Sequence, residues 1–307
     1  MTLHLTGYVT LPEHKGKGGF DHAAVHAGSG HVYVAHTAND AVDVFDPNAG
    51  KYLFSVPNLT AVAGALVSDD SQLVFTSNRG ENTIGVFAPG PDPKVTKIAV
   101  GVRPNGLAYD AKRGLVLAAN VGDPAVPRSY TLSMVDLDAG RMRASIEVPG
   151  RTRWTVFDPE AEAFYVNIMH PSQIVVVEAR KPDRVARTIA VPADGAHGLD
   201  FDPETRRLFC ACDSGVLVTL DAGSGKVLSE GKLSGVPDGV WFNPKRRQLY
   251  VAVGDPGVVD VFDTTAMRSL GRVVTEKDAH TTAFPPTGGS LIAFLPASHR
   301  AALYRVT

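Results

Sequence analysis

Apolar and polar residues alternate in short runs along the chain, and the runs recur with a period of about 40 residues. The segment HVYVAHTANDAVDVFDPNAGK, which starts at His31, is two such runs around a polar loop, and it returns four times in altered form. Another run precedes the copies, as in NGLAYD from Asn105, and a shorter one follows, as in IAVP from Ile189. Turns rich in Asp, Gly and Pro separate the runs. Each repeat therefore predicts four β-strands, which is the content of one propeller blade.

The start of the innermost strand can be aligned in seven repeats. The aligned residues are His22, Ala63, Asn105, Arg153, His197, Asp238 and His280, at spacings of 41, 42, 48, 44, 41 and 42 residues. Only 27 residues follow His280, enough for three strands, whereas the YVTLP run from Tyr8 repeats the pattern of a last strand. We therefore expect an all-β, seven-bladed β-propeller of four-stranded antiparallel blades, a single domain over residues 1–307, with its last blade closed by the N-terminal strand. Such closure removes two open sheet edges.

The composition agrees with many short strands joined by tight turns, since 44% of the residues are hydrophobic, 20% are charged, and there are 30 Gly and 21 Pro. A net charge of −2 without clustered Lys and Arg argues against nucleic acid or a membrane as partner. No run of about 18 apolar residues occurs, and the start MTLHLTGYVT lacks a secretory signal. We expect a soluble, cytoplasmic protein; an exported protein whose signal peptide had been removed would look the same. The sequence does not indicate the oligomeric state.

The residue pattern of the repeat resembles that of a known group of propellers. VYVAHTANDAVDVFDPNAGK is similar to the YVTN-type repeat of bacterial propellers, in which a Tyr-Val-Thr-Asn-like strand is followed by Asn-Thr-Val and an Ile-Asp ending. The resemblance covers essentially the whole chain. It implies a propeller blade and no particular activity.

A second resemblance, to gluconolactonases and relatives of senescence marker protein, rests on RPNGLA around Asn105 and VPDGV around Asp238. In that family, Asn-Gly-Leu and Pro-Asp-Gly segments place metal ligands at the channel mouth, which implies metal-dependent lactone hydrolysis. The family is six-bladed, and an acidic ligand of its first blade has His22 in the corresponding place here. Asp238 is the ligand position that matches in both residue type and context.

The innermost strands start next to the central channel of a propeller, so side chains from distant parts of the sequence are expected to meet there. His22, His197, Asp238 and His280 are the predicted metal ligands. Three imidazoles and one carboxylate favour Zn, Fe, Mn, Ni or Cu over Ca, which prefers oxygen ligands. The alternative is that these groups only satisfy hydrogen bonds inside their blades. Their identities differ from blade to blade, which favours a site, because a structural requirement of the blade would recur.

Asn105 and Arg153 of the same ring are predicted to orient the substrate. Arg suits bidentate capture of a carboxylate or phosphate, so an anionic or carbonyl-containing molecule is expected. An ion pair of Arg153 with Asp238 or Glu160, which would merely neutralise the channel, explains the residue equally well.

Loops between the second and third strands of the blades are expected at the same end of the channel. Their polar residues are His36, Arg79, Arg128, His170, Asp213, Asp255 and His299. Of these, His36 and His170 are the predicted general bases, which would act on a metal-bound water. A solvated surface position is the simpler explanation for any one residue of the set.

Together these features predict a metal-dependent enzyme that acts on a small polar or carbonyl-containing molecule at the channel mouth. Hydrolysis of a lactone or ester is the reaction that the resemblance to gluconolactonases implies, with isomerisation, elimination and oxygen chemistry at a redox metal left open. The alternative is a non-catalytic propeller that binds a ligand or a protein through its loops, because fold alone does not decide function.

Overall fold

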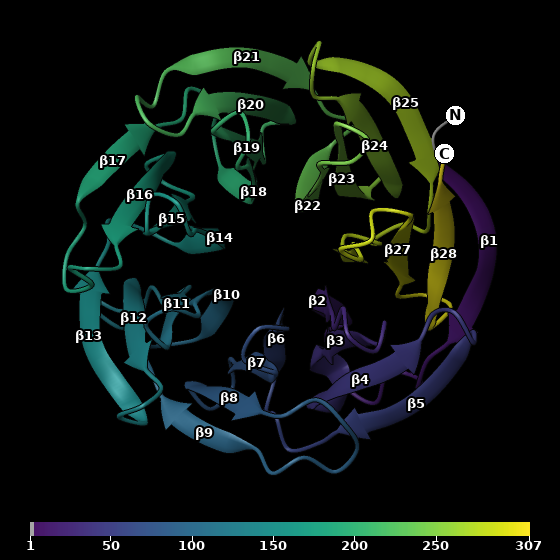
Figure 1. Ribbon diagram of the computed structural model, residues 1–307, viewed down its shortest axis with the longest axis horizontal. Helices are drawn as coiled ribbons and strands as arrows, with labels where there is room; N and C mark the ends of the chain where they lie inside the picture. The colour runs from purple at the N-terminus through teal and green to yellow at the C-terminus, as the bar shows by residue number, and fades with distance from the viewer. Residues whose placement is uncertain (1–2) are drawn as a thin grey trace.

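The computed structural model describes residues 3–307 and shows seven four-stranded antiparallel sheets in a ring around a central axis (Figure 1). Nearly all of its regular structure is β, and helix is confined, within these residues, to one short 3-10 turn, η1 (Thr37–Asn39). No helix in this range is long and apolar enough to cross a membrane. The prediction of an all-β, seven-bladed propeller is confirmed.

Blades 1 to 3 follow one another along the chain, each numbered from its innermost to its outermost strand. Blade 1 consists of β2 (Phe20–Val25), β3 (Val32–His36), β4 (Ala41–Asp46) and β5 (Lys51–Val56). Blade 2 consists of β6 (Val62–Ser68), β7 (Leu73–Asn78), β8 (Thr83–Phe87) and β9 (Thr96–Ala99). Blade 3 consists of β10 (Pro104–Asp110), β11 (Leu115–Asn120), β12 (Thr131–Asp136) and β13 (Arg141–Glu147).

Blades 4 to 7 continue the same order. Blade 4 consists of β14 (Thr152–Asp158), β15 (Ala163–Ile168), β16 (Gln173–Glu178) and β17 (Arg187–Ala190). Blade 5 consists of β18 (Ala196–Asp202), β19 (Arg207–Cys212), β20 (Val216–Asp221) and β21 (Val227–Lys232). Blade 6 consists of β22 (Val236–Asn243), β23 (Gln248–Asp255), β24 (Val258–Asp263) and β25 (Arg268–Val274). Blade 7 consists of β26 (Thr282–Ala283), β27 (Ser290–Leu295), β28 (Arg300–Val306) and β1 (Leu3–Thr10).

The N-terminal strand completes the last blade. Strand β1 runs antiparallel to β28, from Leu3 opposite Val306 to Thr10 opposite Arg300. The Arg300 guanidinium also lies over the Tyr8 ring, 4.3 Å from its centroid. Figure 1 shows β1 on the outer side of β28, where it covers that strand's edge. The predicted closure is confirmed, and it pairs an edge that would otherwise be free to associate with other chains.

The apolar faces of neighbouring blades pack against each other and form the core. Tyr33, Tyr165 and Tyr250 hold the same place in their repeats, on the second strand of the blade, and all three are fully buried. Between blades 5 and 6, the rings of Phe209 and Phe242 lie 5.4 Å apart. Burial of one such side chain contributes about 1.5–3 kcal/mol. The repeated alternation of the sequence thus builds the interfaces between blades.

In six blades the innermost strand carries a β-bulge close to its start. The aligned residues of the sequence lie within these bulges: His22, Ala63, Asn105, Arg153, His197 and Asp238. A bulge bends its strand and changes the direction of the side chains in it. The strands begin slightly earlier than predicted, for example at Pro104 in β10, whereas His280 precedes the short strand β26.

Glycine follows the aligned residue in four blades, where the backbone touches the next blade. A Cβ at Gly64 would lie 2.5 Å from the carbonyl oxygen of Asn105, and one at Gly198 would lie 2.3 Å from that of Asp238. Such distances are too short for a real side chain, so only glycine permits this approach of backbones. The glycines therefore set the spacing of the innermost strands and hold the aligned residues close together.

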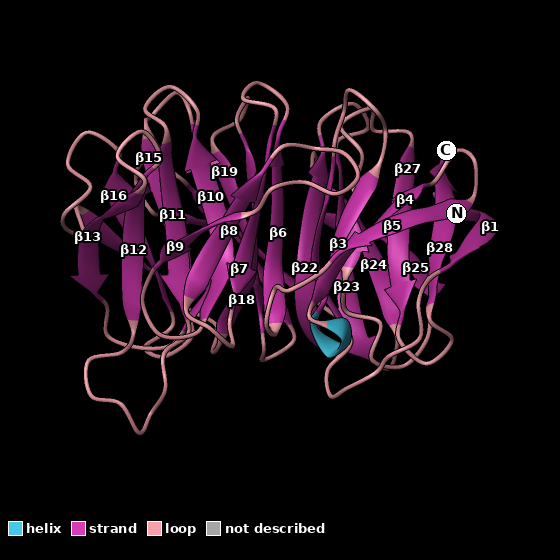
Figure 2. Ribbon diagram, turned by 90° about the horizontal axis from the view of Figure 1, so that it is seen from below, coloured by secondary structure: helices cyan, strands magenta, loops and turns pink. Residues whose placement is uncertain are grey.

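The turn η1 and the long loop 121–130 project from the same end of the ring, the lower end in Figure 2. The innermost strands begin at this end, since Phe20 at the start of β2 pairs with His36 at the end of β3. We call this end of the channel the mouth.

Candidate functional site

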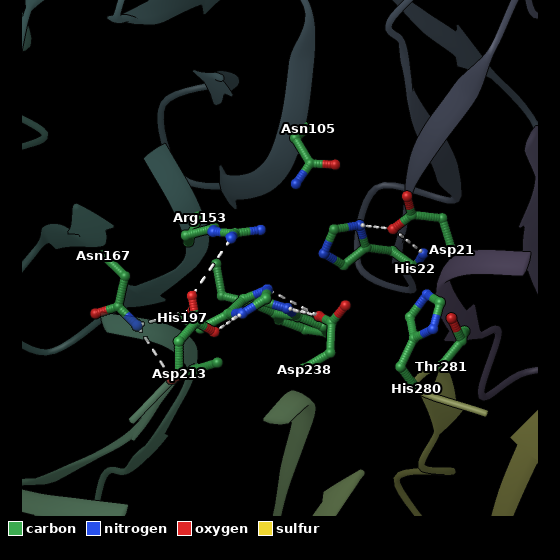
Figure 3. A network of polar contacts seen from close by, with 12 residues as sticks. Asp21, His22, Asn105, Arg153, Asn167, His197, Asp213, Asp238, His280 and Thr281 are labelled. Carbon is green, nitrogen blue, oxygen red and sulfur yellow. Dashed lines mark hydrogen bonds and ion pairs between the residues drawn. The ribbon is translucent and has the colours of Figure 1, made fainter. Parts of the chain in front are cut away.

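Six polar side chains from six blades surround the axis at the mouth. Figure 3 shows them directed toward a common space: His22, Asn105, Arg153, His197, Asp238 and His280. Ala63 of blade 2 leaves its place in the ring without a polar group. The ring predicted from the repeat therefore exists as a cluster in space, although its members span most of the chain.

His197 is held by a carboxylate and faces a second one. Its Nδ1 is 2.6 Å from Oδ1 of Asp213, which lies directly after β19, and its Nε2 is 3.5 Å from Oδ1 of Asp238. Burial alone would raise the pKa of Asp213, but the hydrogen bond and charge of His197, together with the charge of Arg153, lower it. Asp213 is therefore an anion that fixes the imidazole and leaves Nε2 turned toward the channel.

Trp154 connects this pair to His22 on the other side of the axis. Its indole Nε1 donates a hydrogen bond of 2.7 Å to Oδ1 of Asp238, and its ring meets that of His22 edge to face at 4.3 Å. Nδ1 of His22 lies 3.1 Å from both Oδ1 of Asp21 and the carbonyl oxygen of Ala63. Its Nε2 is buried and has no hydrogen-bond partner in the described part of the chain.

The charges around His22 change its protonation and that of its neighbour. Burial alone would lower the pKa of His22, but the hydrogen bond and charge of Asp21, together with the charge of Asp238, raise it. Burial alone would raise the pKa of Asp21, whereas the hydrogen bond and charge of His22 and the charge of Arg79 hold it well below its usual range. The pair is therefore stabilised as an imidazolium beside a carboxylate.

Arginine side chains add positive charge to the mouth. Arg79, directly after β7, donates to Oδ1 of Asn105 at 2.5 Å and lies 3.3 Å from Oδ2 of Asp21. Burial lowers the pKa of Arg151, and the charges of Arg153, Arg79 and Arg103 lower it further. Three guanidinium groups thus lie close enough to act on that of Arg151.

Arg153 makes few strong hydrogen bonds to other described residues. Its side chain is 14% exposed. Its Nη2 donates at 3.3 Å to Sδ of Met169, which is a weak acceptor, and lies 3.5 Å from Oδ2 of Asp213. Its Nε is buried without a partner among residues 3–307. A guanidinium has five N–H donors, and the contacts of Arg153 with other described residues use few of them.

The predicted metal ligands are only partly brought together. Nε2 of His197 and Oδ1 of Asp238 are 3.5 Å apart, and two ligands of one tetrahedral zinc ion lie roughly 3.3–3.6 Å apart. Nδ1 of His280 instead contacts the Asp278 carbonyl oxygen at 2.7 Å. No group of three or more His, Cys, Asp or Glu within residues 3–307 is arranged so that it could hold a metal ion. Among the described residues, His197 and Asp238 are thus the two predicted ligands that lie at the spacing of ligands to one ion.

Beyond the ring, toward the other end of the channel, lies a cavity of about 770 Å³. Its lining includes His22, Trp154, Trp241 and Asp200. Burial raises the pKa of Asp200 to about 7, although two backbone N–H groups donate to its carboxylate. The cavity joins the apolar middle of the channel to the polar mouth, so it adds room for the body of a ligand.

The two predicted general bases lie outside this cluster. His36 ends β3 inside blade 1, is fully buried, and has Nδ1 2.6 Å from Oδ2 of Asp43. His170 has a side chain that is 58% exposed and lies 3.2 Å from Oδ1 of Asp194. Of the other loop residues, Arg79 and Asp213 reach the mouth, whereas Arg128 is exposed and bonded to Glu147.

Trp154 and Asp21 are site residues that the sequence reasoning did not single out. Four other blades have a glycine directly after the aligned residue, whereas Trp154 takes that place in blade 4. This departure from the repeat could have marked Trp154 as a site residue. Asp21 precedes His22 directly, and only the bulge shows that its carboxylate also faces the mouth.

The fold and the mouth define this chain as a seven-bladed β-propeller with a polar, arginine-rich channel entrance. No protein-family profile and no curated protein matches the sequence. Among solved structures, a chain in a crystal structure of a mitotic checkpoint complex is similar, with a TM-score of 0.82 and 11% sequence identity over 98% of this chain and 91% of that one. At this identity, the likeness shows the fold alone.

Proposed function

We propose that the mouth binds a small anionic molecule through its carboxylate or phosphate group, and that His197 exchanges a proton with the bound molecule. The observation that supports this most directly is the incompletely bonded, largely buried guanidinium of Arg153. Leaving such a group without good acceptors is costly, and a carboxylate or phosphate matches its paired N–H donors. Arg79 and Arg151 would add to the attraction for an anion.

The surroundings of His197 suit proton transfer. Asp213 accepts from Nδ1, so the neutral imidazole presents its lone pair at Nε2, on the channel side. A carboxylate in this position orients the ring and stabilises the imidazolium that forms when Nε2 takes a proton. Asp213 contacts both Arg153 and His197, so a carbonyl compound anchored at Arg153 by its anionic group would present its reactive carbon beside His197.

Hydrolysis of a lactone or ester remains the reaction that we consider first. It rests on the similarity to gluconolactonases at Asp238 and its Pro-Asp-Gly segment. We likewise propose that the chain belongs to the YVTN-type propellers, because the residue pattern of its repeat is similar to theirs.

A metal-dependent form of this enzyme is the second candidate, favoured by the 3.5 Å separation of His197 Nε2 and Asp238 Oδ1. Asp213 behind His197 resembles the carboxylate that often orients a metal-binding imidazole. His22, through its unpartnered Nε2, and His280 would have to move to complete the set. Such a metal would be Zn, Fe, Mn, Ni or Cu, and it would polarise a carbonyl group.

Thermal unfolding with a panel of small carboxylates and phosphate esters tests the anion site, because a ligand that binds the folded state raises the melting temperature. We expect at least one anion to stabilise the protein and Arg153→Gln to weaken its binding about tenfold or more. Arg143→Gln, on the exposed outer strand β13, is the matched control and should bind normally. Equal affinity in both variants, or no stabilising anion, would contradict the proposal.

The catalytic part is tested by turnover of lactone and ester analogues that carry such an anionic group. His197→Gln should retain binding but lose about 10²–10⁴-fold in rate. Binding without any turnover in the unaltered protein would leave a non-catalytic binding module. Elemental analysis separates the metal-dependent form: a near-stoichiometric transition metal that is lost in His22→Ala/His280→Ala supports it, and a metal-free active protein contradicts it.

A further inference from the structure

Below the mouth, the innermost strands form the wall of the cavity of about 770 Å³. One place in these strands can be compared around the ring, because it pairs with the same place in the second strand of each blade, as Trp241 does with Tyr250. In six blades the residue at this place lines the cavity: Ala24, Leu66, Ala108, Val156, Asp200 and Trp241. The seventh blade has Ala283 there. Asp200 is therefore a single charged residue at an otherwise apolar level of the channel.

The Asp200 carboxylate is held in place by the backbone. Its Oδ1 accepts from the N–H of Phe201 at 2.8 Å, and its Oδ2 accepts from the N–H of Phe242, in the next blade, at 2.6 Å. A carboxylate has about four lone-pair sites, so these two bonds leave it able to accept more. Since the other six blades have an apolar residue at this level, a carboxylate is not required to build a blade.

Basic side chains of blades 5 and 6 contact other carboxylates: His197 with Asp213, Arg206 with Asp158, and Arg247 with Asp202. No ion pair within residues 3–307 includes Asp200. Burial, together with the negative charge of Asp202, raises the pKa of Asp200 to about 7, although the two backbone N–H groups oppose the shift. A cation placed beside this carboxylate would therefore stabilise its ionised form.

Two indole rings stand at the same part of the channel. The rings of Trp154 and Trp241 both line the cavity, with centroids 6.1 Å apart. Their N–H groups already donate, to Asp238 and to the carbonyl oxygen of Thr282. The indoles thus offer aromatic surface to a ligand but no free donor for an anion, and aromatic surface attracts cations.

The far end of the cavity, opposite the mouth, has an excess of negative charge. The turns that follow the innermost strands place four carboxylates and two basic side chains in its lining: Asp69, Asp70, Asp110, Glu162, Lys112 and Arg113. The two basic groups are already paired, Lys112 with Glu162 and Arg113 with both Glu162 and Asp110. The potential at this entrance therefore favours a cation over an anion.

We propose that the channel cavity binds a primary arylalkylamine, whose ammonium group donates to the carboxylate of Asp200. The apolar residues at this level and the two indoles contact the body of the ligand, and the ammonium group supplies the cation that the carboxylate lacks. The inference does not depend on the anion site at the mouth, because such a ligand carries no anionic group.

2-Phenylethylamine is a suitable probe, because at about pH 8 it is an ammonium ion and Asp200 is mostly ionised. Isothermal titration calorimetry at this pH should show that it binds to the full-length protein. 2-Phenylethanol has the same ring and chain length without the charge, and it should bind at least about tenfold more weakly. Equal affinity for the two compounds, or no binding of the amine, would overturn the proposal without the use of any variant.

Asp200→Asn removes the charge and keeps the size of the side chain. It should weaken binding of the amine about tenfold or more and leave binding of the alcohol nearly unchanged. Asp70→Asn is the matched control, because this exposed carboxylate lines the far end of the same cavity, and it should bind the amine normally. Equal losses in both variants would show a general attraction to negative charge and would overturn the assignment to Asp200.

Ala24→Phe is a second variant, which keeps Asp200 and adds a large side chain at the same level of the channel, where Ala24 is partly exposed. It should weaken binding of both the amine and the alcohol. Thermal unfolding shows whether each variant is folded. Unchanged binding of the amine in folded Asp200→Asn or Ala24→Phe would overturn the proposal.

Discussion

His22 carries a protonation equilibrium that makes its contribution to stability depend on pH. Its pKa is raised in the folded protein, so its stabilising effect is complete below the ordinary histidine pKa of about 6.5 and is lost as the pH rises through the folded value. The difference in unfolding free energy between the protein and His22→Gln should therefore be larger at about pH 6 than at about pH 9. Urea titrations at both pH values measure this, and a difference that grows with pH would contradict it.

The two tryptophans of the channel offer a paired test of the hydrogen bond to Asp238. Trp154 donates to that carboxylate at 2.7 Å, whereas Trp241 donates to the carbonyl oxygen of Thr282 at 3.1 Å. Hydrogen bonds to charged groups contribute more than neutral ones, about 1.5–3 against 0.5–1.5 kcal/mol. Trp154→Phe should accordingly lower the free energy of unfolding more than Trp241→Phe does. Chemical denaturation measures both losses, and the reverse order would show that Asp238 gains little from the indole.

At this scale the sequence predicts the composition of the ring but not its contacts. His197 and Asp238 could be recognised from their place in the repeat, because the repeat maps residue number onto position around the axis. That His197 would pair with Asp213 and face Asp238 depends on side-chain directions set by the bulges. The contacts of His36 could not be predicted either, because the end of its strand lies inside the blade and its side chain is directed toward Asp43.

The spacing of the innermost strands brings the aligned residues of the repeats together at the mouth. Gly198→Ala would place a Cβ 2.3 Å from the carbonyl oxygen of Asp238, and the strand would have to move. Overpacking of this kind costs about 1–3 kcal/mol. Gly289→Ala is the matched control, because a Cβ there meets nothing within 4 Å. Urea denaturation should show a clear loss for Gly198→Ala alone; similar values for both would mean that the glycine does not set the strand spacing.

The elements themselves were predictable because each blade repeats the same alternation and the same turns. Their ends were less so: β10 starts at Pro104, one residue before the predicted start, and β26 has only two residues, Thr282 and Ala283. A bulge cannot be read from periodicity, since it depends on how two strands pair. The bulges therefore appear only in the structure, although they decide where the ring residues point.

Closure by β1 should determine whether the whole ring remains intact. Removal of residues 1–11 would leave the edge of β28 unpaired and expose the apolar face beneath it. We expect a lower melting temperature and self-association, measured by thermal unfolding and size-exclusion chromatography. A synthetic peptide of residues 1–12 should reverse both effects by adding a strand in trans. A truncated protein that stays monomeric and equally stable would show that the closing strand is dispensable.

For the molecule as a whole, we propose that the seven blades bring Arg153 and His197 together at one anion-binding mouth. A crystal of the protein soaked in selenate tests this most directly, because anomalous scattering locates the selenium atom without reference to any assumed ligand. We expect an anomalous peak between the Arg153 guanidinium and Nε2 of His197. Selenate bound elsewhere on the surface, with no peak in the mouth, would contradict it.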